Sequence, residues 1–154
     1  MPFIRETICA VAIGFSATVA HAQEAAPTIA EEGDWVLKKS ENSSGPGAAC
    51  ILAPKSRSRI QIVGDRLEVT GLPKNSIFNY QYRIDDGPVS SIGFPTASMQ
   101  QAGAVTLEGA AFESILNGRR FSIRLLDRWH EAITEEVSLA GLRSLRDRSA
   151  EACR

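Results

Sequence analysis

The chain is poor in the residues from which most active sites and metal centres are built. Among its 154 residues there are only two histidines and three cysteines, and aromatic residues make up 6%. The cysteines and histidines do not form the spaced clusters that zinc sites use, and no strand-to-helix nucleophile motif is present. We therefore expect no bound metal, no cofactor and no catalytic residue.

An excess of charge of either sign is also missing. The chain has 17 basic and 18 acidic residues, which gives a formal net charge of −1, and the two signs are interspersed. Such a chain has no large field that would attract nucleic acid or an anionic membrane. Neither is expected as a partner.

No hydrophobic run is long enough to span a membrane. An uncharged, largely apolar stretch, residues 7–20, lies behind Arg5 and leads into Ala20-His21-Ala22. As a helix these fourteen residues rise only about 21 Å, short of the roughly 30 Å hydrocarbon core. A basic start, a short apolar core and a small-x-small site predict a signal peptide over 1–22 and a periplasmic or secreted protein with no transmembrane segment after cleavage.

Cleavage would change the number of cysteines from three to two, because Cys9 lies in the signal. The remaining pair, Cys50 and Cys153, is predicted to form a disulfide in an oxidising compartment, the alternative being two unpaired buried thiols. A bridge that encloses about a hundred residues stabilises by about 4–5 kcal/mol in the chain-entropy model. We expect a flexible linker over 23–33 and one β-rich domain over 34–154 that this disulfide closes.

Short apolar segments with alternating periodicity and turn signals between them predict strands. Residues 59–63 and 66–70 flank Gly64-Asp65 and predict a hairpin. Residues 77–84 predict a strand with Phe78, Tyr80, Tyr82 and Ile84 on one face, followed by a type I′ turn at Asp86-Gly87. Further strands are predicted over 34–39, 48–53, 90–94, 104–107, 121–129 and 132–137, with a loop over 40–47.

Two segments have helical character. Residues 110–116 predict a short helix, and the leucines after Ser138 predict an amphipathic helix that Ser138 caps and that ends at Cys153. The fold class is therefore all-β, an antiparallel sandwich or partly closed barrel with one short internal helix and a C-terminal helix.

Histidine chemistry has one candidate after signal cleavage. His130 could act as a general base with Asp85 or Asp86 nearby, in a hydrolase. A half-exposed turn residue is the more common role for such a histidine, and Gly87 explains the two aspartates as turn residues.

Ligand binding has several candidates. The arginines at 119, 120, 124 and 128 could form a basic stripe for an acidic ligand or a lipid A-type phosphate, although Asp127 and Glu131 could offset it. A groove could also involve Tyr80, Tyr82 and Arg83, although same-face aromatics in a strand, like Trp35, more often belong to the core. The candidate ligand-binding residues are Tyr80, Tyr82, Arg83 and Arg124.

The chain resembles the invasion-associated locus B family and related small exported proteins of alphaproteobacteria. The resemblance is carried by the signal peptide, the strands of Trp35 and Cys50, the run Tyr82-Arg83-Ile84-Asp85-Asp86-Gly87, and the run 137–142 that leads into the terminal helix and Cys153. Extra cysteines near the tryptophan strand, frequent in that family, are missing here. The resemblance implies a periplasmic or surface β-sandwich with a role in host-cell invasion or the envelope, and it supplies no catalytic residue.

Taken together, export, a β-rich pattern and the lack of catalytic clusters predict a noncatalytic binding or interaction protein of the bacterial envelope. Its partner is expected to be another protein or an envelope component. Two alternatives remain, a periplasmic hydrolase that uses His130 and a chaperone-like subunit of an envelope machine.

Overall fold

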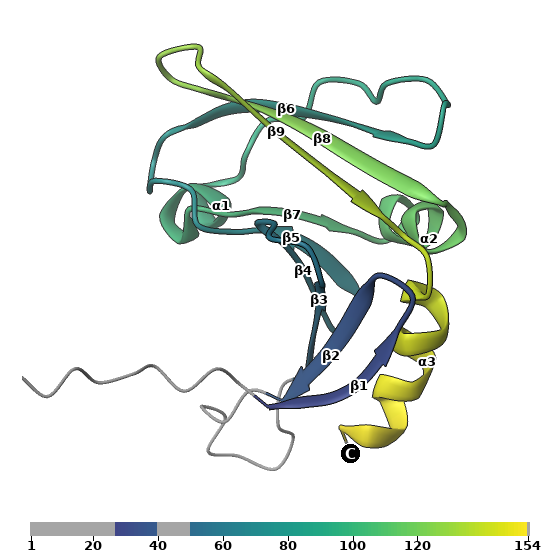
Figure 1. Ribbon diagram of the computed structural model, residues 1–154. Coiled ribbons are helices and arrows are strands. Elements are labelled where there is room, and N and C mark those ends of the chain that lie inside the picture. The colour runs from purple at the N-terminus through teal and green to yellow at the C-terminus, as the bar shows by residue number, and fades with distance from the viewer. Residues whose placement is uncertain (1–26, 40–49, 154) are drawn as a thin grey trace, which may run out of the picture.

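The computed structural model describes residues 27–39 and 50–153 (Figure 1). The predicted signal peptide, the first part of the predicted linker and the predicted loop over 40–47 lie outside these residues. The described chain forms two antiparallel sheets, neither of which closes into a barrel. The larger has the order β1-β2-β3-β4-β5-β7, and the smaller has the order β6-β8-β9.

The strands of the six-stranded sheet are β1 (Thr28–Glu32), β2 (Trp35–Lys39), β3 (Cys50–Pro54), β4 (Ile60–Val63), β5 (Arg66–Val69) and β7 (Val105–Glu108). The three-stranded sheet consists of β6 (Ile77–Ile84), β8 (Arg120–Asp127) and β9 (Ala132–Ser138). The helices are α1 (Ala97–Ala102), α2 (Ala110–Asn117) and α3 (Leu142–Ala152). The prediction of an all-β antiparallel fold with a C-terminal helix is confirmed.

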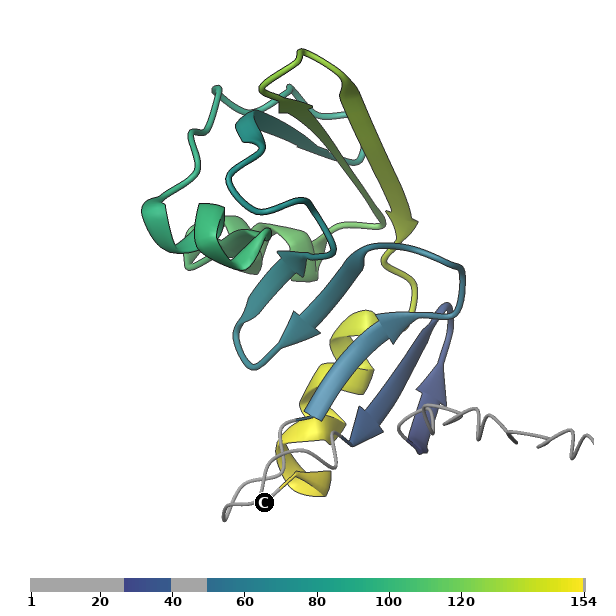
Figure 2. The ribbon, with the colours of Figure 1, turned by 90° about the vertical axis from the view of Figure 1, so that its left-hand side faces the viewer.

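The three-stranded sheet lies over the β5 and β7 end of the larger sheet, and α3 packs on β1, β2 and β3 (Figures 1 and 2). One hydrophobic core joins all of these layers. Trp35, Ile62 and Leu67 of the six-stranded sheet and Phe121 of the three-stranded sheet are all fully buried in it. Trp35 also donates its indole N–H to the Ser138 carbonyl at 2.8 Å, which links β2 to the end of β9.

The predicted hairpin is confirmed in detail. Ile60 pairs with Val69 and Ile62 pairs with Leu67, and all four side chains are buried. Gly64, at the turn, has a φ of 60°, which explains why glycine suits it.

The predicted linker is wrong over its described part, because residues 28–32 form β1 and pair with β2. Two contacts hold this strand in place. Glu32 accepts a hydrogen bond from the Ser144 hydroxyl on α3 at 2.7 Å. In the turn between β1 and β2, the Asp34 N–H donates to the Ala140 carbonyl at 3.0 Å. Strand β1 lies at the edge of the sheet and has one solvated face, which explains its polar residues. Its amino-acid composition therefore resembles that of a linker.

Strand β6 has the predicted bounds, but the side chains at its start do not follow the predicted alternation between core and solvent. A β-bulge between Ile77 and Asn79 breaks the register with β8. As a result Ile77 is buried and Phe78 is exposed, whereas Phe78 was predicted on the core-facing side with Tyr80 and Tyr82.

Two local predictions at turns and helix ends are also wrong, and one helix is missed. After β6 the residue with positive φ is Asp85, at 52°, so the predicted type I′ turn at Asp86-Gly87 does not form. Ser138 is the last residue of β9, and α3 is capped by Gly141 instead, which has a φ of 84°. Helix α1 was not predicted, because none of its residues is buried and it has no apolar periodicity.

Candidate functional site

Large apolar side chains gather on the surface around the three-stranded sheet. Six of them are substantially exposed among the described residues, and five lie in this sheet or beside it. These five are Phe78, Val89, Ile92, Phe94 and Trp129; the sixth, Ile29, is on β1. Grouped exposed apolar side chains are typical of interaction sites, whereas single ones need no explanation.

Three of these side chains belong to one segment, residues 85–96, which runs along the open edge of β6. The segment is held by backbone hydrogen bonds between Tyr80 and Gly93 of 3.0 and 2.8 Å, and by a bond from the Ser90 N–H to the Tyr82 carbonyl of 2.8 Å. The predicted strand over 90–94 therefore exists only as this single bridge. The segment keeps a fixed path while Val89, Ile92 and Phe94 face solvent.

Gly93 is required at this bridge because the Tyr80 ring lies on it. A Cβ atom at Gly93 would come within 2.5 Å of a ring carbon of Tyr80. Burial, with a smaller contribution from Tyr82, raises the pKa of the Tyr80 phenol. Tyr80 thus anchors the segment and stays neutral.

The β8–β9 turn presents the most exposed of the apolar side chains. One carboxylate oxygen of Asp127 accepts hydrogen bonds from the backbone N–H groups of Trp129 and Glu131, each at 2.8 Å. His130 has a φ of 64°, and its ring packs edge-on against Phe78 with the centroids 5.4 Å apart. Trp129, at the tip, is 72% exposed.

Polar side chains fill the outer face of the same sheet. In one row Gln81 of β6, Arg124 of β8 and Thr134 of β9 are directly opposite one another, and in the next row Arg83 is opposite Ser122. Because side chains at alternate positions share a face, these five lie together. They line a hollow of about 250 Å³ whose wall includes Val89; Tyr82 and Ile123 complete the lining.

The hollow is positively charged. Its lining contains Arg83 and Arg124 and no carboxylate. Within residues 27–39 and 50–153, neither arginine forms an ion pair. Glu136 is the acidic residue nearest in register, opposite Ser122, but its ion pair is with Arg120, at 3.9 Å.

The structure thus brings together three of the four candidate ligand-binding residues, namely Tyr82, Arg83 and Arg124. Tyr80 packs on Gly93 and does not line the hollow. Sequence reasoning missed Ser122 and Thr134, because a lone hydroxyl on a strand carries no signal until the register is known. It also missed the exposed apolar segment, where the only cue was Pro88 at the start of a short apolar run.

The basic stripe that Arg119, Arg120, Arg124 and Arg128 could form is not continuous. The carboxylate of Asp85 accepts hydrogen bonds from the backbone N–H groups of Arg119 and Arg120, at 2.8 and 2.9 Å, and these bonds lower its pKa. The Arg120 guanidinium pairs with Asp86 at 2.5 Å as well as with Glu136. Arg120 is therefore occupied by acidic neighbours, and only Arg124 of the stripe lines the hollow.

His130 and the two aspartates lie at opposite ends of β6. His130 contacts Phe78 near the start of this strand, and Asp85 follows its last residue. Seven residues of extended chain span roughly 23 Å at about 3.3 Å per residue. The pairing of His130 with Asp85 or Asp86 that the hydrolase alternative requires is not formed, and Asp85 is used in holding the start of β8.

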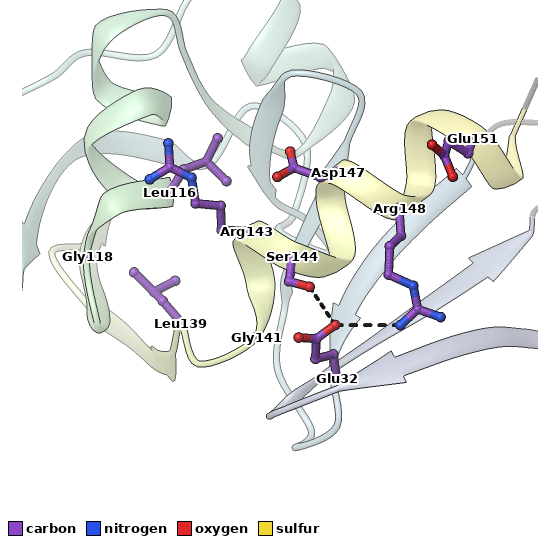
Figure 3. A pocket seen from close by; sticks show the side chains of 10 residues that line it. All are labelled: Glu32, Leu116, Gly118, Leu139, Gly141, Arg143, Ser144, Asp147, Arg148 and Glu151. Atoms are coloured by element: carbon purple, nitrogen blue, oxygen red, sulfur yellow. Dashed lines mark hydrogen bonds and ion pairs between the residues drawn. The ribbon is translucent and has the colours of Figure 1, made fainter.

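A second hollow, of about 690 Å³, lies between β1, the end of α2 and one side of α3, from Arg143 to Glu151 (Figure 3). Several of its polar side chains are already bound to protein groups. Glu32 accepts from Ser144 and pairs with Arg148 at 3.5 Å (Figure 3). Arg143 donates to the side chain of Asn117, at the end of α2, at 2.5 Å. These contacts hold α3 against β1 and α2. Because the groups that make them are already bound to each other, this hollow is a weaker candidate for ligand binding than the one on the three-stranded sheet.

The cysteines at the two ends of the domain meet. Cys50, on β3, and Cys153, at the end of α3, have Cα atoms 6.0 Å apart and sulfur atoms at disulfide distance. Both side chains pack against the hydrophobic core. The link joins the C-terminal helix to the larger sheet.

Two features are missing from the described residues. No helix there is long and apolar enough to cross a membrane. No group of three or more histidine, cysteine, aspartate or glutamate side chains in that part of the chain is arranged to hold a metal ion. Comparison of the chain with protein-family models, curated proteins and solved structures finds no match.

Proposed function

We propose that the chain is an exported, noncatalytic binding protein of the bacterial envelope, and that its binding surface is the three-stranded sheet with its apolar margin. The observation that carries this proposal is the exposed segment beside β6, where Val89 and Ile92 are each 52% exposed and Phe94 is 66% exposed. Full burial of an exposed apolar side chain of this size is worth about 1.5–3 kcal/mol, and a partner that covers these side chains would gain the part of that amount that matches their exposed area.

The surface is built to be rigid. Hydrogen bonds to β6 fix the apolar segment, and the Asp127 carboxylate fixes the turn that carries Trp129. A preformed surface loses little conformational entropy on binding, which favours affinity. The partner is another protein or an envelope component, and the resemblance to the invasion-associated locus B family supports a role at the cell envelope.

The test is binding of envelope extract by the purified mature domain. Wild-type protein, immobilised at increasing density, should retain a partner saturably, and free wild-type domain should compete for it. A Val89→Ser/Ile92→Ser/Phe94→Ser variant should lose this binding while keeping the wild-type circular dichroism spectrum. The control is Ile29→Ser, which removes an exposed apolar side chain from β1. Equal retention by the triple variant and the wild type would refute the assignment of the surface.

Export is tested separately. N-terminal sequencing of the protein recovered from the periplasm or medium should begin at Gln23, since the small-x-small site ends at Ala22. Recovery only from the cytoplasm, with the N-terminal segment intact, would contradict the proposed location.

A further inference from the structure

We propose that the hollow on the outer face of the three-stranded sheet binds a phosphate group between Arg83 and Arg124. This inference rests on the proposed function, because it names the ligand chemistry of the same surface. The ligand is a phosphate monoester, with the phosphate in the hollow and an apolar body against the segment of Val89, Ile92 and Phe94.

Hydrogen-bond donors converge on the hollow. Arg83 is opposite Ser122 in the register, and Arg124 is two residues further along the same strand. The two arginines are therefore diagonal neighbours, with Cα atoms about 7–8 Å apart. Both long side chains can reach one group in the hollow that they line.

The electrostatics of the hollow favour an anion. Two exposed guanidinium groups on adjacent strands repel each other, and among the described residues neither has a carboxylate partner. Other arginines of the two sheets do have such partners: Arg59 pairs with Glu135 at 3.1 Å, and Arg66 pairs with Glu68 at 2.7 Å. An anion between Arg83 and Arg124 would replace the repulsion with two charge-assisted contacts.

The arrangement of the donors favours an anion with the shape of a phosphate group. The donors come from three strands, because the Ser122 and Thr134 hydroxyls lie on the same face as the two arginines, and neither hydroxyl has a hydrogen-bond partner among the described residues. Donors that approach from several directions match the three terminal oxygens of a phosphate monoester better than the two coplanar oxygens of a carboxylate. Arginine, moreover, pairs with phosphate in a bidentate geometry.

The apolar body of the ligand follows from the wall of the hollow. Val89 lines the hollow directly, and Ile92 and Phe94 continue the same held segment along the edge of β6. A phosphate in the hollow would therefore place the group attached to it beside exposed apolar side chains. Phosphorylated lipid headgroups and small soluble phosphomonoesters both have this chemistry.

The first measurement is titration calorimetry of the full mature protein with inorganic phosphate as the probe. We expect saturable binding to the wild type and at least a tenfold weaker affinity for Arg83→Gln/Arg124→Gln. The matched control is Arg57→Gln/Lys74→Gln, which removes the same charge from exposed side chains outside the hollow and should bind like the wild type. Equal affinity of the wild type and the Arg83/Arg124 variant, or no binding to the wild type, would overturn the inference.

Two further probes sharpen the result. Acetate should bind at least tenfold more weakly than phosphate, and equal affinities would overturn the assignment to phosphate. Sedimentation with vesicles of phosphatidylcholine, with or without phosphatidic acid, distinguishes the sources. Binding only to vesicles with phosphatidic acid identifies a lipid headgroup, whereas phosphate binding without vesicle binding identifies a soluble phosphomonoester.

Failure of the phosphate inference can be distinguished from failure of the proposed function. If the apolar triple variant loses the envelope partner while the wild type binds no phosphate, the binding surface is correct and the phosphate inference fails. Because Arg83 and Arg124 are exposed, the double variant should unfold at the wild-type urea concentration, which shows that any loss of binding is local.

Discussion

Two glycines at the junction of β1 and α3 are in contact across 108 residues of sequence. Gly33, in the β1–β2 turn, has a φ of 53°, and a Cβ there would lie 2.2 Å from the Ala140 carbonyl oxygen. Gly141, which caps α3, has a φ of 84°, and a Cβ there would lie 2.4 Å from the Glu32 carbonyl oxygen. Two backbones approach so closely that neither position has room for a side chain.

Gly141→Ala should therefore destabilise the protein by more than the cost of its backbone conformation. A left-handed conformation costs an L-residue about 1–2 kcal/mol, and displacement of the Glu32 carbonyl adds to this, so we expect at least about 2 kcal/mol in total. Urea denaturation measures the effect. Gly64→Ala is the control, since Gly64 has a similar φ of 60° but no atom within 4 Å of its Cβ position. Equal losses in the two variants would show that the close contact is unimportant.

Asp85 links the end of β6 to the start of β8 through its charge. The backbone N–H groups of Arg119 and Arg120 hold the pKa of Asp85 below its ordinary value of 3.8. A lowered pKa in the folded state means that the ionised carboxylate stabilises the fold above the unfolded value, and that this stabilisation is lost as pH falls through the folded value.

We expect Asp85→Asn, which keeps an oxygen acceptor but cannot ionise, to show a weaker dependence of stability on acid. The difference in urea midpoint between wild type and variant should be constant above about pH 5 and should shrink below about pH 4. Asp147→Asn, which changes an exposed carboxylate on α3 that accepts no backbone N–H, is the comparison. A difference that stays constant down to pH 2 would contradict the assigned role of Asp85.

At the scale of elements, Cys50 on β3 and Cys153 at the end of α3 lie at disulfide distance and connect the C-terminal helix to the larger sheet. Cys50 and Cys153 are separated by 103 residues, so the bond restricts the unfolded chain strongly. We expect Cys50→Ser/Cys153→Ser to lose about 4–5 kcal/mol of unfolding free energy, or somewhat less where the reduced chain keeps residual structure. Reductant should lower the stability of the wild type towards that of the variant and leave the variant unchanged. Detection of a free Cys50 by alkylation of protein from the envelope would contradict the disulfide.

The elements that sequence reasoning predicted are those with a strong local pattern. The hairpin of β4 and β5 has alternation and a glycine turn, and β8 has five alternating residues that start at Phe121. Elements that depend on distant partners were missed. Strand β1 is stabilised by β2 and α3, and α1 is stabilised at its ends, where the Thr96 hydroxyl accepts from the Met99 N–H at 3.3 Å.

The candidate site shows the same limit. Arg83 and Arg124 were identified from the sequence, because charged residues on the outward face of a strand are visible in the alternation. Their position next to each other depends on the pairing of β6 with β8, which alternation does not specify. A bulge between Ile77 and Asn79 changes the pairing at the start of β6. The sequence pattern does not show where such a bulge lies, so the register at Arg83 is known only from the structure.

At the scale of the whole molecule, one core serves both sheets, so the sheets should unfold together. Buried residues of the six-stranded sheet, the three-stranded sheet, α2 and α3 form a single cluster. Trp35, with none of its surface exposed, reports on the larger sheet, and Phe121, equally buried, belongs to the smaller one. A Trp129→Phe background leaves Trp35 as the only tryptophan.

In that background we expect Trp35 fluorescence and far-ultraviolet circular dichroism to give the same urea midpoint, as two-state unfolding requires. Phe121→Ala should lower the midpoint of the Trp35 signal although the two residues lie in different sheets, because truncation of a buried phenylalanine costs about 3–5 kcal/mol of the shared stability. Ile29→Ala, at an exposed position on β1, should change the midpoint little. If Phe121→Ala shifts the circular dichroism transition and leaves the Trp35 transition in place, the sheets are separate folding units, and the binding surface on the smaller sheet could be lost while the larger sheet stays folded.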